Sequence, residues 1–189
     1  LPVLESDESG QVEGERSGGV TGRERRVATS REGNLPYPMR AIRTRDFLYI
    51  HNFEPDRWPV GDPRGLDDLN AEAPSWESIW STTRIAYSEM DGGPTKAWMI
   101  HHRADEDVQP LFQIGFGKRP REELYDLTVD PDYMNNVAGH PDYQHTRKDL
   151  ADQLMRVLRE NDDPRLVESP CRFEHTPYAG PLEGDDLRV

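Results

Sequence analysis

The sequence contains one cysteine, no long apolar run and fewer basic than acidic residues. Cys171 has no second cysteine to pair with, so an internal disulfide is excluded. No stretch of about 18 apolar residues occurs, so no membrane span is indicated. Lys and Arg number 23 against 36 Asp and Glu, and the formal net charge is −13. This charge argues against nucleic-acid binding, which needs a basic surface to replace phosphate counterions, and an acidic substrate would require a local basic site.

Apolar residues are also scarce. They make up 34% of the 189 residues, below the roughly 45–50% of an ordinary globular chain. Together with 16 prolines and 15 glycines, this composition predicts a small core surrounded by much loop. The length suits one domain or a piece of a larger one. The chain opens on Leu1 without a signal segment, so we expect a processed chain or a fragment.

The clearest local pattern predicts a β-hairpin. Residues 39–43 alternate apolar and charged side chains, which is typical of a half-buried strand. Residues 44–46 suit a turn, and residues 47–53 are rich in the aromatic and β-branched side chains that favour strands. Shorter strands are expected at residues 20–22 and 123–127.

The last strong element is a helix at residues 141–160. Leu150, Leu154, Val157 and Leu158 form one apolar stripe at helical spacing, and Pro141 suits the first turn. Between the hairpin and this helix, residues 54–94 predict a long irregular excursion with a short helix near residues 76–80. Two more short helices are expected at residues 95–102, with Thr95 near the cap, and at residues 108–116. The predicted fold is therefore α+β, a small antiparallel sheet packed against a C-terminal helix.

Few residues suggest chemistry by themselves. The cluster Arg23, Glu24, Arg25 and Arg26 follows a possible strand end, and arginine suits a bidentate grip on sulfate or carboxylate. The alternative is a solvated charged loop. Adjacent helical residues point about 100° apart, so His101 and His102 cannot easily share a metal ion.

The remaining candidates are weaker still. Cys171 lies in the tail with no evident base, although a reactive thiol needs a lowered pKa. The sequence has neither a glycine-rich phosphate loop nor the paired-cysteine spacing of a zinc site. These residues alone do not identify an enzyme.

Two longer motifs carry a resemblance to a known family. The run E-L-Y-D-L at residues 123–127 precedes a D-P turn at 130–131, N-V-A at 136–138 and a final helix, which is similar to the C-terminal signature of the bacterial type I, formylglycine-dependent sulfatases. Tyr133 departs from that pattern, since relatives often carry Glu there. The run Y-P-M-R-A-I-R-T at residues 37–44, followed by an aromatic strand, resembles the heparan N-sulfatase (N-sulfoglucosamine sulfohydrolase) branch in particular. The resemblance covers about residues 1–165.

The resemblance implies a division of the chain. Residues 1–35 would end a large, alkaline-phosphatase-like α/β domain, residues 36–165 would form the C-terminal subdomain, and residues 166–189 would be a flexible tail. The family uses calcium and a formylglycine made within a C/S-x-P-S-R motif. This chain has no such motif, because Ser169, Pro170, Cys171 and Arg172 stand in the wrong order and place. We therefore assign no catalytic or metal-binding residue here and expect both cofactors in a missing N-terminal catalytic domain.

The resemblance also suggests substrate-binding residues. The run V-T-G-R-E-R-R at residues 20–26 resembles the last parallel strand of the large domain and the loop after it, which would face the active-site pocket. Relatives often read G-R-E-R-H, so Arg26 replaces a histidine and cannot serve in proton transfer, because arginine stays charged. The candidates are Arg23, Glu24, Arg25 and Arg26, with weaker support for Asn34 and Arg40.

The function implied is that of a sulfatase. The intact protein would hydrolyse sulfate esters or sulfamates on sugars or glycosaminoglycans, outside the cell or in the periplasm, with no nucleic-acid or membrane partner. This chain would complete the fold and shape the substrate pocket, and would be inactive alone. The alternative is a non-catalytic carbohydrate-binding or interaction module that retains the sulfatase C-terminal fold. A phosphatase-like relative on the same fold is less favoured by the E-L-Y-D-L run.

Overall fold

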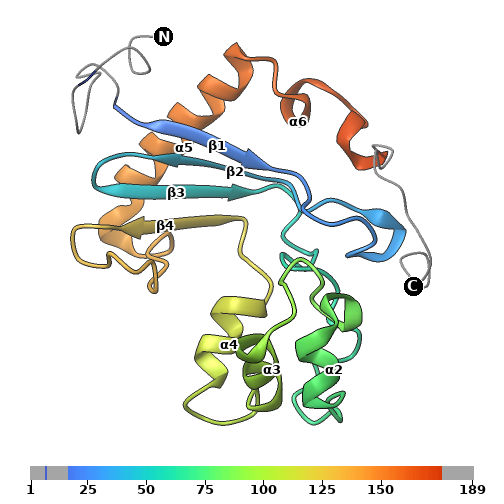
Figure 1. The fold of residues 1–189 in the computed structure, drawn as a ribbon. Coiled ribbons are helices and arrows are strands. Elements are labelled where there is room, and N and C mark those ends of the chain that lie inside the picture. Colours follow the sequence, from blue (N-terminus) through green and yellow to red (C-terminus); the bar gives the residue numbers. More distant parts are fainter. Residues whose placement is uncertain (1–6, 8–16, 176–189) are drawn as a thin grey trace.

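The computed structural model describes Asp7 and residues 17–175. Its centre is a four-stranded antiparallel sheet in the order β1 (Gly19–Arg23), β2 (Met39–Arg43), β3 (Phe47–Asn52) and β4 (Glu122–Asp126). The long helix α5 (Gln144–Glu160) lies behind this sheet, and three short helices form a separate layer below it (Figure 1). The α+β fold with a small antiparallel sheet and a packed C-terminal helix is therefore confirmed.

The predicted hairpin forms as β2 and β3. Ala41 pairs with Ile50 and Ile42 with Tyr49, so the alternation of side chains places one set on each face of the sheet. Thr44 closes the turn, because its backbone N–H donates to the Phe47 carbonyl at 2.9 Å and its hydroxyl accepts from the Phe47 N–H at 3.0 Å.

The final helix covers one face of the sheet. Leu150, Leu154 and Leu158 are buried against Ile42, Tyr49 and Leu124, and full burial of one such side chain stabilises the fold by about 1.5–3 kcal/mol. Val157 of the predicted stripe is only half-buried. The first predicted turn is a separate 3-10 helix, η3 (Pro141–Tyr143), and the α-helix begins at Gln144.

The excursion between β3 and β4 has a core of its own, which the sequence patterns did not predict. It contains α2 (Trp76–Ser81), η2 (Thr83–Ile85), α3 (Pro94–His101) and α4 (Gln109–Phe116). This core could not be predicted because its side chains come from short segments with little periodicity. The buried members are Leu66, Ile79, Ala86, Tyr87, Ala97, Ile100, Phe112 and Phe116. The short helix predicted near residues 76–80 is confirmed, whereas α3 begins at Gly93 and Pro94 without a side-chain cap from Thr95. We call this part the helical insert.

Lys96 stabilises the helical insert by hydrogen bonds in its interior. Its side chain is buried, and its ammonium group donates to the carbonyls of Thr83 at 2.9 Å, Tyr87 at 3.2 Å and Met90 at 2.9 Å. Burial lowers the pKa of Lys96 to about 8, with a smaller opposing effect from Asp91. One buried side chain therefore satisfies three carbonyls of a segment that has no strand to pair with.

The strand β1 lies at the edge of the sheet. Val20 pairs with Ile42 and Gly22 with Arg40, both antiparallel. Within the described residues β2 is its only partner, and the two strands are antiparallel. The sequence resemblance implies that β1 is the last parallel strand of a large domain, whereas the described residues show it as the edge strand of the small antiparallel sheet. Its residues Gly19–Gly22 are largely exposed.

The predicted flexible tail is structured at its beginning. The helix α6 (Pro164–Val167) and the 3-10 helix η4 (Arg172–His175) follow α5, and Figure 1 shows them passing over the end of β1. The reason is electrostatic, because Glu174 forms ion pairs with Arg57 at 2.9 Å and with Arg165. Residues 176–189 of the predicted tail lie outside the described residues.

Candidate functional site

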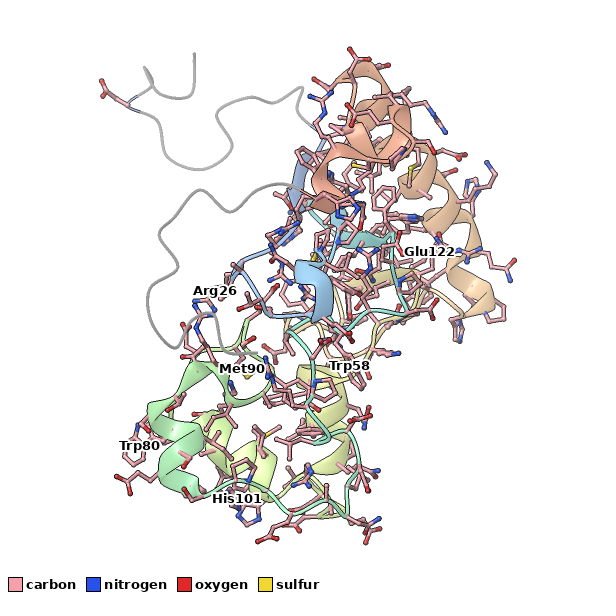
Figure 2. The ribbon with its side chains drawn as sticks, turned by 90° about the vertical axis from the view of Figure 1, so that its right-hand side faces the viewer. Arg26, Trp58, Trp80, Met90, His101 and Glu122 are labelled. Carbon is pink, nitrogen blue, oxygen red and sulfur yellow. The ribbon has the colours of Figure 1, made fainter. Side chains whose placement is uncertain are left out.

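The loop after β1 carries four of the six predicted substrate-binding residues. It leaves the edge of the sheet and crosses toward the helical insert, where Figure 2 shows Arg26 close to Met90. Arg26 donates to the Glu89 carbonyl at 2.7 Å and pairs with Asp91 at 2.7 Å, with 47% of its side chain exposed. Arg26 therefore connects the loop after β1 to the helical insert, and part of its side chain still faces solvent.

Glu24 and Arg40 lie at the centre of an ion-pair network. Arg40 pairs with Glu24 at 2.8 Å and with Asp163 at 2.6 Å. Arg165 pairs with Glu24 and also with Glu174. This network of Glu24, Arg40, Asp163, Arg165 and Glu174, called the tail network below, ties the loop after β1 to the segment after α5.

The tail network also sets the charge state of its members. Burial by itself would lower the pKa of Arg40, but the hydrogen bonds to Asp163 and Glu24 outweigh it and raise the pKa. Arg165 behaves in the same way through Glu24 and Glu174. Both arginines are therefore firmly charged and already neutralised by carboxylates, so Glu24 and Arg40 have partners within the fold.

A second network surrounds Glu89. Arg31 pairs with its carboxylate at 2.7 Å with both side chains buried, and Arg23 lies 3.6 Å from it. Arg31 also donates to the carbonyls of Trp58 at 2.6 Å and Pro59 at 3.0 Å. Sequence reasoning missed Arg31 and Glu89, which are 58 residues apart, because no local spacing links them.

Arg25 and Asn34 have structural contacts as well. Arg25 donates to the Phe173 carbonyl at 2.9 Å, and burial lowers its pKa. Asn34 takes a φ of 54°, and its side-chain oxygen accepts from the Thr29 N–H at 3.1 Å. Such a bond stabilises a left-handed residue in a tight loop.

A cavity of about 580 Å³ opens beside the tail network. Its walls include Arg23, Glu24 and Arg40 from the predicted set, together with Asp163 and Phe173. Arg25, Arg26 and Asn34 do not line it. The structure thus brings three predicted residues to one cavity, and substrate binding by any of the six remains a prediction.

The described residues do not fit the metal that the resemblance implies. Among them, no group of three or more His, Cys, Asp or Glu side chains could hold an ion. His102 pairs with Asp105 at 2.7 Å and stacks on Trp98, whereas His101 packs on Trp76, so the two histidines face different neighbours. No helix in the described part is long and apolar enough to cross a membrane.

Comparison with known proteins gives two curated relatives. The human (Homo sapiens) N-sulphoglucosamine sulphohydrolase is 26% identical over 156 residues, which cover 82% of this chain and 26% of the relative. The chain is therefore similar in sequence to a sulfatase over most of its length. The ulvan-active sulfatase of Formosa agariphila is 27% identical over 135 residues, covering 69% of this chain and 18% of the relative. The recognition of a C-terminal sulfatase portion from the two sequence motifs is thereby supported, whereas no family model matches.

The sulfatase relatives are much longer than this chain, which spans about a quarter or less of their length. A solved structure of a protein in complex with its substrate D-glucosamine-2-N,6-O-disulfate aligns with a TM-score of 0.41 and 18% identity. That alignment covers 88% of this chain and 20% of the other.

Proposed function

We propose that this chain is the C-terminal part of a sulfatase that hydrolyses sulfate esters or sulfamates on sugars. The observation that carries the proposal is the match to N-sulphoglucosamine sulphohydrolase over 82% of the chain. The motifs at residues 37–44 and 123–127 lie on β2 and β4, which both pair with β3 in the central sheet. The protein would act in the periplasm or outside the cell, where sulfated polysaccharides occur.

The role proposed for this part is to complete the fold and shape the substrate pocket. The contacts of the tail network support that role, because Arg40 and Arg165 hold Glu24 and thus the loop after β1 in one position. Arg26, near the start of that loop, keeps nearly half of its side chain exposed. It is the member of the predicted set best placed to meet a sulfate or carboxylate without losing a buried partner.

The chemical step would come from elsewhere in the intact protein. A formylglycine nucleophile and calcium are proposed for the missing catalytic domain, where calcium would stabilise the sulfate oxygens. No step is assigned to a residue of this chain, in keeping with the lack of a C/S-x-P-S-R motif.

The test compares this chain with a version extended upstream to the nearest start codon. Both are assayed on a small aryl sulfate and on N-sulfoglucosamine. We expect activity only in the extended protein, and Arg26→Ala there should raise KM more than it lowers kcat, because Arg26 would bind substrate in both ground and transition states. Inactivity of both proteins would contradict the sulfatase proposal and favour a non-catalytic module. Arg45→Ala, at a side chain 95% exposed on the hairpin turn, is the control.

A further inference from the structure

A second cavity, of about 440 Å³, opens on the sheet face opposite α5. It lies between the sheet and the helical insert, and its apolar wall includes Leu48 and Ile50 of β3 and Ile114 of α4. The volume falls within the range of about 300–1,000 Å³ that is usual for small-molecule sites. Gly22 and Arg23, at the end of β1, line both cavities, whereas no member of the tail network lines the second.

The floor of this cavity contains a buried carboxylate. Glu123 is 5% exposed, and its two oxygens accept from the Asn52 amide and from the Tyr125 hydroxyl, each at 2.7 Å. No ion pair to Glu123 is formed within the described residues. A carboxylate has about four lone-pair positions, so Glu123 keeps capacity to accept from a ligand hydroxyl.

Tyr37 is a second buried polar group on the cavity wall. It is 1% exposed, and its hydroxyl is buried without a hydrogen bond among the residues described. Leaving such a group unpaired costs about 1–3 kcal/mol. Burial and, to a smaller extent, the charge of Glu123 raise the pKa of Tyr37, so its hydroxyl remains a donor.

The rim supplies positive charge and an aromatic ring. Arg119 lines the cavity, is half-buried, and forms no hydrogen bond or ion pair within the described part of the chain. Tyr133 is 39% exposed, and its ring stands edge-on to Tyr125 with centroids 6.1 Å apart.

We propose that this cavity binds one sugar residue carrying a sulfate or carboxylate group. Glu123 and Tyr37 would take its hydroxyl groups, and Arg119 its anionic group. The ring of Tyr133 and the apolar wall would cover the less polar face of the sugar. This inference rests on the proposed function, because it names a subsite for the sulfated sugar substrate.

The test measures binding of small sugars to the intact protein that carries this chain. Calorimetry is run with glucose 6-sulfate, D-glucuronate and, as the neutral comparison, glucose. We expect at least one anionic sugar to bind at least tenfold more tightly than glucose, and the tighter of the two identifies the anionic group. Arg119→Gln and Tyr133→Glu should each weaken that binding at least tenfold. Arg45→Gln and Tyr133→Phe are the matched controls and should bind as the wild type does.

The outcomes separate this inference from the sulfatase proposal. If neither anionic sugar binds, or if Arg119→Gln or Tyr133→Glu binds within twofold of wild type, the inference is overturned. Hydrolysis of a small aryl sulfate is measured on the same samples. Hydrolysis without sugar binding removes the subsite and leaves the proposed function standing, whereas Arg119-dependent sugar binding without hydrolysis supports the subsite and removes the sulfatase proposal.

Discussion

At the scale of single residues, Arg40 has a side chain suited to binding an anionic ligand, but in this fold it stabilises the structure instead. Its side chain is 8% exposed and meets carboxylates from Glu24 and Asp163. The arginine fork that suits sulfate also suits carboxylates. The residue type therefore predicts that the partner is an anion, but not whether that anion is a ligand or a side chain of the same protein. Here two partners lie within the chain, one of them 123 residues away.

Glu174 provides a pH test of the tail network. Burial alone would raise its pKa, but hydrogen bonds from Arg165 and Arg57 hold the pKa below the ordinary 4.5. The unfolded chain therefore takes up the proton first, so the stabilisation by Glu174 is complete above about pH 4.5 and is lost as pH falls through the lowered folded value. We expect Glu174→Gln to lower the free energy of unfolding by about 2 kcal/mol at pH 7, with the difference shrinking below pH 4.5.

The measurement for Glu174 is denaturant unfolding of both proteins across that pH range. Glu160→Gln is the matched control, since Glu160 is 59% exposed and 3.7 Å from Arg156. A deficit for Glu174→Gln that stays constant down to the acid-unfolding midpoint would contradict the assignment.

At the scale of elements, the helical insert depends on one tight approach between segments. Gly61 has a φ of +95°, and a Cβ there would lie 2.8 Å from the Ser88 N and 3.1 Å from the Ser30 carbonyl oxygen. The neighbouring Asp62 donates to Ser30 at 2.8 Å and accepts from the Tyr87 N–H at 2.9 Å. Backbone from three segments thus meets at Gly61, where no side chain fits.

Gly65 offers a matched comparison for Gly61. Its φ is +89°, but a Cβ there would meet nothing within 4 Å. Gly65→Ala should therefore cost only backbone strain, about 1 kcal/mol, whereas Gly61→Ala should cost at least about 3 kcal/mol because backbone atoms must also move. Denaturant unfolding of the two variants decides, and equal losses would contradict the close packing at Gly61.

At the scale of the whole molecule, two cores share one chain and meet through charged groups. One core lies between the sheet and α5, and the other lies inside the helical insert. Arg31, Glu89 and Arg26 connect them by ion pairs and backbone contacts. The insert therefore has a fixed place beside the sheet, and the 440 Å³ cavity lies where the two parts meet.

The open edge of β1 predicts how the chain behaves alone. Val20 is 39% exposed, and β1 has no second partner strand within the described residues. An unpaired edge with exposed apolar residues favours association with other chains. We expect the 189-residue chain to self-associate and to melt without a sharp transition, whereas the upstream-extended protein melts cooperatively. Sedimentation and calorimetry test this, and a sharp melting transition of a monomeric short chain would contradict it.

The sequence by itself determined the elements that depend on neighbours along the chain. The alternation at residues 39–43, the aromatic run after it and the leucine stripe of α5 predicted β2, β3 and the covering helix, because strand and helix periods are local properties. The same runs supported the relation to sulfatases, later supported by sequence comparison.

Only the tertiary structure decided what the charged residues do. The pairs Arg31–Glu89 and Arg165–Glu24 join residues 58 and 141 positions apart, respectively. No periodic pattern in the sequence predicts contacts of this kind. The same holds for the core of the helical insert and for the cavity floor, where Asn52 and Glu123 meet across 71 residues. Local patterns determine elements, whereas the partners of buried charges depend on how those elements pack.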